Sequence, residues 1–550
     1  DAAGGEYAAF QAPTTLTASY IMTMPPNTGS TGQFLQTNGS GVLSFATVAS
    51  PPTPGSIELT AAEALSAGQT FVINSSGQAK GVEKVVGTVS ALSSGQAQGG
   101  DNYYFDAIYY PNANYSSGGI SGQGVFGAII RYDSSNAIYQ FLFTVNPNTG
   151  DITGRGDFQI GSSTNKGHSL ALAYSPTVDR GLFFNADAST GDFYCQGFSY
   201  SALTLTASSE LRIYEDYIPH YSTNGTSNKA ALVYDASLNI FVASCDNGTN
   251  MLPVYAILLP LGTGAPTLGG SSTVSTSGWD TNYRFPKLAT NNQGQFVMLA
   301  YDSSGGNTYA VAFTVNPSSS YATTFGSKVQ LSNATQSNDT HSIEYDSASG
   351  KFITTANSSA GIDVRALTVS SNAITLGTAT NLINSQKANH LSSGGDGNLG
   401  VIYSLYSSLA HKPLSVAANG NITLGSSVTI STITGWDTNR NLMVASTEGN
   451  LTAHSSYLSL GTAANYSDTY KTLFKQTISS TSANFVGTVE GAISSGSTGN
   501  VTIIGGVNEN QTGLTAGLKY YVTSVGGLST TTTSAYAGVA LSSTKLLVKG

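Results

Sequence analysis

The sequence predicts an all-β fold, and three observations carry this prediction. Short runs rich in Val, Ile, Tyr, Phe and Thr alternate with polar residues and end at Gly, Asn, Asp or Ser. These runs recur in units of similar length along most of the chain. Sequence patterns from one end of the chain then reappear at the other end. Together these features indicate many antiparallel strands and an architecture built from repeats.

The repeat is clearest in the pentapeptide FTVNP, which occurs at 143–147 and again at 313–317. The two copies lie 170 residues apart, which equals three units of about 57 residues. A large apolar residue after a Tyr-Asp or similar turn marks each unit and is expected to pack between units. The seven residues at this anchor position are Phe126, Leu182, Phe241, Phe296, Phe352, Val401 and Met443.

Seven units spaced by 42 to 59 residues predict a seven-bladed β-propeller over residues 98–475. A single amphipathic four-stranded sheet cannot bury both of its faces, whereas sheets stacked around an axis cover one another. A tandem of β-sandwiches is the alternative architecture. It requires units nearer 90 to 100 residues, which the spacing does not favour.

Small β-modules are expected on both sides of the propeller. The pattern LxAG occurs at 65–68 and 514–517, and VGTV occurs at 86–89 and 486–489. We therefore expect strand modules at 55–97 and 485–550 that lie close in space, with the propeller inserted between them. Residues 1–54 form an N-terminal attachment segment, and the sequence PPTP at 51–54 indicates a stiff linker.

Composition excludes several classes of protein. Only 9% of the residues are charged, the net charge is −9 and no apolar run is long enough to span a bilayer. A nucleic-acid partner recognised through phosphate neutralisation and a membrane-spanning segment are therefore not expected. Cys195 and Cys245 are too few for a disulfide framework or a zinc site. We expect two buried thiols, with a single disulfide between neighbouring strands as the alternative.

The ionisable residues do not form a recognisable catalytic motif. The histidines lack the HExxH pattern and any i, i+4 pair, so neither a metal nor another cofactor is expected. His341 and His390 occupy similar places before strands, where a hydrogen bond at a blade edge explains them. Five aspartates fall in turn signals, where Asp caps its own turn: Asp133, Asp235, Asp302, Asp346 and Asp437. We therefore expect no enzymatic activity.

Aromatic residues in the connections between units are the candidate binding residues. Exposed rings there stack on sugar faces, while Asn, Ser and Thr bond the hydroxyl groups. The alternative is that these rings fill the seams between blades. The candidates for glycan or receptor binding are Tyr214, Tyr217, His220, Tyr221, Trp279 and Tyr283.

The segment 24–45, MPPNTGSTGQFLQTNGSGVLSF, resembles a motif of bacteriophage tail-fibre and virion appendage proteins. The stretches GLTAGLKYYV at 513–522 and GVALSSTKLLV at 538–548 are similar to endings of the same class. Met24 and Phe45 stand where the motif usually has Leu and Trp. The resemblance implies a tail fibre or a capsid fibre that contributes to host-cell attachment.

This resemblance sets the expected partners and location. They are other virion proteins bound through the N-terminal segment, a host surface glycan or receptor, and further copies of the chain, with a trimer favoured by analogy. The location is then the virion surface or the extracellular space. A polysaccharide depolymerase on a propeller scaffold and a secreted adhesin or filament subunit are the alternative functions.

Overall fold

The computed structural model describes most of the chain. The residues described are 15, 21–31, 33–47, 55–85, 89–99, 102–117, 120–132, 137–145, 152–161, 166–187, 192–201, 204–214, 230–245, 252–274, 283–302, 305–332, 341–384, 389–393, 399–405, 408–417, 419–431, 436–445, 454–463, 468–477, 479–524 and 526–549. They form antiparallel strands and two short 3₁₀ helices, η1 (Pro317–Ser319) and η2 (Thr481–Asn484). The predicted all-β fold is therefore confirmed.

The main body is built from antiparallel sheets of four or five strands, and the described residues form seven of them. In the first three sheets, consecutive strands pair in chain order. Sheet 1 contains β8 (Asn102–Ser117), β9 (Ile120–Tyr132), β10 (Ala137–Val145) and β11 (Ile152–Gly161). Sheet 2 contains β12 (Lys166–Ser175), β13 (Arg180–Asp187), β14 (Phe193–Ser201) and β15 (Thr204–Tyr214). Sheet 3 contains β16 (Ala230–Asp235), β17 (Ile240–Cys245), β18 (Pro253–Leu258) and β19 (Thr267–Thr273).

Each of the next three sheets gains a fifth short strand that pairs with its third strand. Sheet 4 contains β20 (Tyr283–Thr290), β21 (Gln295–Asp302), β22 (Asn307–Asn316), β23 (Ala322–Phe325) and β24 (Val329–Gln330). Sheet 5 contains β25 (His341–Asp346), β26 (Lys351–Ser358), β27 (Gly361–Ser370), β28 (Ala373–Leu376) and β29 (Thr380–Ile383). Sheet 6 contains β30 (Asn389–Ser393), β31 (Leu399–Leu405), β32 (Ser408–Val416), β33 (Ile422–Leu424) and β34 (Val428–Ser431).

Sheet 7 joins the two ends of the body. It contains β35 (Trp436–Ala445), β36 (His454–Ala463), β37 (Asp468–Thr477) and, as its outer strand, β7 (Val89–Gly99). Residues 89–97 of β7 lie within the range expected for the front flanking module, yet β7 pairs with β37. The first strands of successive sheets contact one another, and β35 contacts β8. These contacts close the sheets into a ring.

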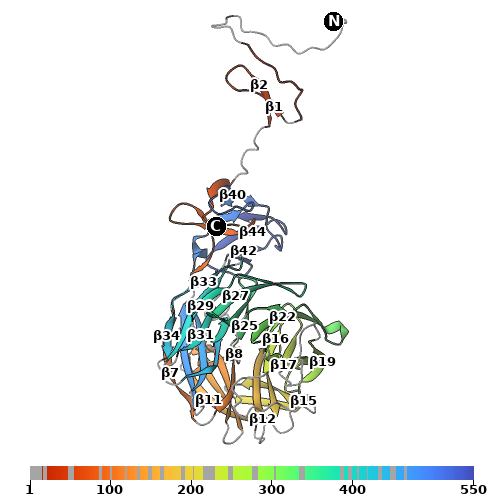
Figure 1. The fold of residues 1–550 in the computed structure, drawn as a ribbon, viewed down its shortest axis with the longest axis vertical. Coiled ribbons are helices and arrows are strands. Elements are labelled where there is room, and N and C mark those ends of the chain that lie inside the picture. The colour runs from red at the N-terminus through yellow and green to blue at the C-terminus, as the bar shows by residue number, and fades with distance from the viewer. Residues whose placement is uncertain are drawn as a thin grey trace.

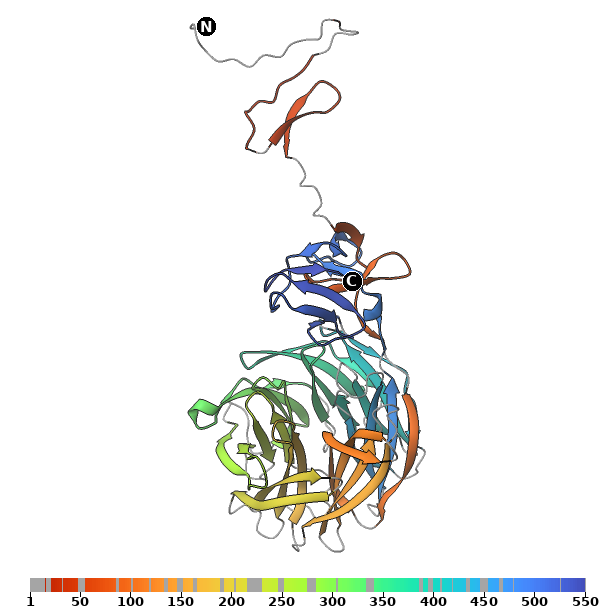
Figure 2. The same cartoon turned by 180° about the vertical axis from the view of Figure 1, so that it is seen from behind.

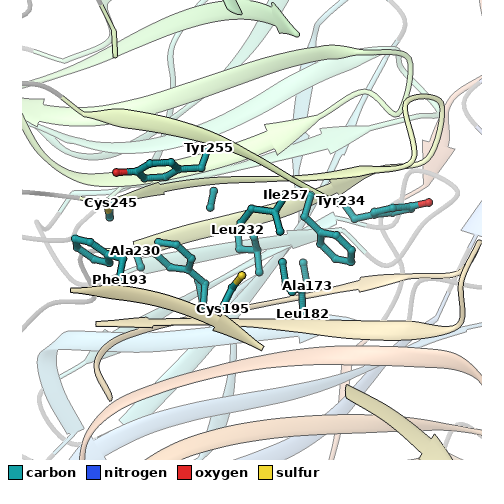
Figure 3. Packing of buried hydrophobic residues seen from close by; sticks show 14 of the residues in the cluster. Ala173, Leu182, Phe193, Cys195, Ala230, Leu232, Tyr234, Cys245, Tyr255 and Ile257 are labelled. Atoms are coloured by element: carbon teal, nitrogen blue, oxygen red, sulfur yellow. The ribbon is translucent and has the colours of Figure 1, made fainter. Parts of the chain in front are cut away.

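Apolar side chains fill the seams between neighbouring sheets. Between sheets 2 and 3, Leu182, Phe184, Leu232 and Phe241 belong to one buried cluster (Figure 3). All seven predicted anchor residues are buried. Met443 differs from the others because it lies on β35, the first strand of its sheet. The turn expected around Asp437 is wrong for the same reason, since β35 runs through this residue.

The flanking strands combine residues from both ends of the chain. One sheet has the order β3 (Ser56–Thr60), β40 (Thr498–Ile503), β39 (Gly487–Val489), β4 (Thr70–Ile73) and β5 (Ala79–Gly81). A second has the order β41 (Val507–Asn508), β45 (Leu546–Val548), β44 (Tyr536–Ala540), β42 (Lys519–Val522) and β43 (Leu528–Ser529). The short β6 (Lys84–Val85) pairs with β38 (Ser479–Ser480). Phe71, Val489 and Val501 share a core, so the front and back flanks pack together.

The N-terminal part described is a hairpin of β1 (Gln33–Thr37) and β2 (Leu43–Thr47). In Figures 1 and 2 it stands apart from the flanking sheets, which lie between it and the main body. No described helix is long and apolar enough to cross a membrane.

Candidate ligand-binding site

The candidate site lies on the innermost strands of the ring. These are the first strands of their sheets, and they contact one another around the axis. We compared positions by counting back along each inner strand from one reference residue. These reference residues are Tyr109, Thr290, Tyr345 and Ser393, which pair with Phe126, Phe296, Phe352 and Leu399 of the second strands. Three residues before each of these stand Asp106, Lys287, Ser342 and His390. Polar and ionisable side chains therefore share one level of the ring.

Asp106 on β8 is partly buried and fixed at both carboxylate oxygens. The backbone N–H of Ala107 donates to Oδ1 at 2.8 Å, and that of Leu172, on the neighbouring inner strand β12, donates to Oδ2 at 2.7 Å. Burial raises the pKa of Asp106 to about 7, against the opposing effects of these hydrogen bonds and of the Lys287 charge. The carboxyl group is thus rigid and titrates near neutral pH.

Lys287 approaches the same region from the far side of the ring. Its strand β20 is separated from β8 by two sheets in one direction and three in the other, yet its charge acts on Asp106. Because the two strands are not neighbours, this interaction crosses the axis of the ring. Asp106 and Lys287 are also equivalent residues of the two sheets that carry the FTVNP repeat.

A β-bulge positions Lys287. The register of β20 against β21 shifts between Arg284 and Lys287, and Phe285 has a positive φ of 55°. The Nε2 atom of His341, on the next inner strand, lies 2.8 Å from the carbonyl oxygen of Phe285. A carbonyl can only accept, so Nε2 carries the proton. Bulges re-aim side chains next to functional sites, and a strained backbone persists where its surroundings fix it.

Glu344 adds a second carboxyl group on β25. It lies two residues after Ser342 and therefore on the same face of the strand. Burial alone raises its pKa to about 8. Ser342 is buried and tied to its surroundings: its Oγ lies 2.6 Å from Oγ1 of Thr355 and accepts from the backbone N–H of Leu391 at 2.8 Å. We call Asp106, Lys287, Glu344 and His390 the axial cluster.

The two histidines singled out from the sequence have different roles. The predicted hydrogen bond at a sheet edge is confirmed for His341, which is buried and bonds across to β20. His390 is offset from His341 by one position and is partly buried. Since successive strand residues face opposite sides, the two rings point in different directions. Only His390 shares the level of Asp106 and Lys287.

The predicted role of the turn aspartates is confirmed for three residues. The backbone N–H groups of Leu238, Gly305 and Ser349 donate to Asp235, Asp302 and Asp346 at 3.0 to 3.2 Å. Asp235 also accepts from Thr290 Oγ1 at 2.5 Å and so ties sheet 3 to sheet 4. Asp133 lies outside the described residues.

The aromatic candidates mostly lie outside the described residues: Tyr217, His220, Tyr221 and Trp279. Tyr214 is the last residue of β15. Tyr283 is only 6% exposed, and Lys328 Nζ donates to its hydroxyl at 2.8 Å. Its ring belongs to the core between sheets 3 and 4, which is the seam-filling alternative. The seam-filling alternative therefore holds for Tyr283, and the binding roles of the other five candidates stay predictions.

The expected pair of buried thiols is confirmed. Cys195 and Cys245 are both buried and unbonded, and both lie in the seam between sheets 2 and 3 (Figure 3). Burial raises the pKa of the Cys195 thiol well above its ordinary value. Among the described residues, no group of three or more His, Cys, Asp or Glu side chains is arranged to hold a metal ion.

Sequence comparison finds no matching family model and no matching curated protein. Among solved structures, the periplasmic gluconolactonase PpgL of Pseudomonas aeruginosa is similar over 73% of this chain and 100% of its own, at 10% identity and a TM-score of 0.39. A candidate 6-phosphogluconolactonase from Bacteroides uniformis is similar over 66% of this chain and 90% of its own, at 12% identity and a TM-score of 0.41. AofleA from Arthrobotrys oligospora is similar over 79% of this chain and 96% of its own, at 8% identity and a TM-score of 0.35. Such distant likenesses do not indicate what this chain binds or converts.

The predicted virion appendage function is wrong on this comparison. The similar structures include proteins described as lactonases, and those reported above are not phage appendages. The tail-fibre, host-attachment and receptor-binding roles therefore have no support beyond the short motifs. Motifs of this kind consist of Gly, Asn, Ser and Thr at turns, and turn chemistry recurs in unrelated β proteins.

Proposed function

We propose that the chain is a seven-bladed β-propeller whose axial cluster binds a hydroxylated carboxylate of monosaccharide size. The seven sheets and the contacts that close them support the blade count. The observation that carries the binding role is the action of the Lys287 charge on Asp106 across the ring, with Glu344 and His390 on the inner strands of two further sheets. A rigid scaffold with a few convergent polar groups is typical of small-molecule sites.

The charges of the cluster select the ligand class. With pKa values of about 7 and 8, Asp106 and Glu344 are largely neutral at pH 6, so they do not repel an anionic ligand that approaches Lys287. An ammonium group attracts a ligand carboxylate through a charge-assisted hydrogen bond. The carboxyl and imidazole groups of the axial cluster can accept from and donate to hydroxyls. A sugar acid supplies both kinds of group.

The test is calorimetric titration of the full chain with D-glucuronate, with D-glucose as the uncharged comparison. We expect binding of glucuronate at pH 6 and a weaker affinity at pH 9, where Asp106 and Glu344 are ionised and repel the ligand carboxylate. Replacing Lys287 with Gln should weaken binding by about 10- to 100-fold, the usual value of a hydrogen bond to a charged group. The surface variant Lys549→Gln is the matched control.

Two results would overturn this proposal. One is the absence of glucuronate binding at either pH, and the other is equal binding by Lys287→Gln and Lys549→Gln. The second would show that the ligand occupies another part of the chain.

Acid–base chemistry on the bound ligand is the second candidate function. Carboxyl groups with pKa values near 7 and 8 are suited to proton transfer at neutral pH, because a general acid or base works best near its own pKa. Its test is NMR of glucuronate incubated in D₂O with the protein. Deuterium incorporation that is lost in Asp106→Asn would support catalysis, and an unchanged spectrum would leave binding alone.

We also propose that the protein acts outside the cytoplasm. The low share of charged residues, with only 21 Lys and Arg in 550 residues, suits an environment with proteases because it offers few trypsin sites. Limited trypsin digestion tests this property. A body that is cleaved as fast as a typical globular protein would contradict it.

A further inference from the structure

The N-terminal hairpin segment, residues 21–47, exposes an unusual share of apolar surface. Of the thirteen large hydrophobic side chains that are exposed among the described residues, six lie in this segment: Ile21, Met22, Met24, Phe34, Leu35 and Val42. Every residue of β1 is exposed, and Leu43 is the one large hydrophobic residue of the segment that is buried. An isolated two-stranded hairpin of this kind is marginally stable in water.

The hairpin also has an open edge. One edge of β2 is covered by residue Thr23, whose N–H donates to Gly41 and whose carbonyl accepts from Leu43, both at 2.8 Å. Among the described residues, β1 pairs only with β2, so its other edge presents free backbone groups. Proteins usually protect such edges with charged residues or Pro. The sequence of β1, QFLQT, contains neither.

The absence of charged residues in the hairpin segment indicates which partner it can bind. No Asp, Glu, Lys, Arg or His occurs between Glu6 and Glu58, while the chain as a whole carries a net charge of −9. A charged partner therefore finds no complementary group on this segment. A second copy of the same neutral segment meets no electrostatic repulsion, even though the bodies of the two molecules repel each other.

We propose that residues 21–47 are a self-association module, in which β1 of one chain lies against the same segment of another copy. Phe34 and Leu35 are adjacent and so face opposite sides of the hairpin. Association of copies covers both faces as well as the open edge. This mode of contact is the addition of a strand to an exposed edge. It does not depend on the axial cluster or on its ligand.

The test compares two lysine substitutions in the full chain by light scattering after size-exclusion chromatography. Leu35→Lys places a charge in the open edge strand, where the side chain is 37% exposed. Leu268→Lys is the matched control, because Leu268 is 41% exposed on β19, an outer strand of sheet 3. We expect an oligomer of fixed stoichiometry for the wild type and for Leu268→Lys, and a monomer for Leu35→Lys.

Hydrogen exchange locates the contact. Amides of residues 33–37 should exchange slowly in the wild type and at least tenfold faster in Leu35→Lys, while the amides of the seven sheets stay unchanged. A monomeric wild type would overturn the proposal, and so would an oligomer that survives Leu35→Lys. Unchanged exchange of the seven sheets in the variant shows that the main body is still folded, so loss of the oligomer is assigned to the hairpin segment.

Discussion

The seam between sheets 2 and 3 and the axial cluster are both enclosed by strands of the same ring, yet their chemistry is opposite. The seam holds Leu, Phe, Ala and two buried thiols (Figure 3). The axis holds two carboxyl groups, an ammonium group and an imidazole. Burial of the seam residues stabilises the fold, whereas burial of the axial carboxyls opposes it. Buried groups that oppose folding are typical of functional sites, and this is the basis of the binding role proposed for the axial cluster.

The largest expected effect is in the seam. Phe241 is 1% exposed and contacts the ring of Tyr234 at a centroid distance of 5.0 Å. Phe241→Ala removes a buried ring and leaves a cavity, so it should lower the free energy of unfolding by about 3–5 kcal/mol. Chemical denaturation measures this loss. A loss below about 1 kcal/mol would show that the seam does not hold the sheets together.

A change of opposite sign is expected at the axis. The pKa of Glu344 rises from 4.5 to about 8, so folding becomes less favourable as pH rises from about 4.5 to 8. Glu344→Gln removes this penalty and should raise the free energy of unfolding by about 3–4 kcal/mol at pH 7–8. At pH 4 the two proteins should be equally stable. Chemical denaturation at pH 4 and at pH 8 measures the sign of this change in the free energy of unfolding. A variant that is less stable than the wild type at pH 8 would contradict the prediction.

A smaller effect on stability is expected at His411, a buried polar residue that lies outside the seam between sheets 2 and 3 and outside the axial cluster. His411 is fully buried, its Nε2 lies 2.9 Å from Oε1 of Gln476, and burial lowers its pKa from 6.5 to about 4. The unfolded chain therefore takes up this proton below pH 6.5 while the folded chain does not. Stability should fall between pH 7 and pH 5 by about 2 kcal/mol from this residue.

The comparison protein for this last effect is His411→Gln, which lacks the titrating group. Its loss of stability between pH 7 and pH 5 should be smaller than that of the wild type by about 2 kcal/mol. Parallel curves for the two proteins would show that His411 is protonated in the folded state.

Several features followed directly from local sequence. The alternation of apolar and polar residues predicted the strands, the buried thiols followed from two isolated cysteines, and Asp235, Asp302 and Asp346 were predicted from turn composition. Asp437 is the exception. The sequence GWDTNRNLMV resembles the turns of the other units, but it lies within β35, which pairs with β36 at Trp436 and again from Asn441 onward.

The axial cluster was decided by tertiary structure alone. Asp106, Lys287, Glu344 and His390 are far apart in the sequence, and each looks like an ordinary polar residue of a strand. Closure of the ring brings their strands together, the bulge at Phe285 re-aims Lys287, and enclosure by neighbouring sheets shifts the carboxyl pKa values. The alternation of apolar and polar residues determines which side chains of a strand point toward the neighbouring sheet, because this alternation is a local property of the strand. It does not determine which strands meet around an axis or how much water they exclude, since both depend on the closed ring.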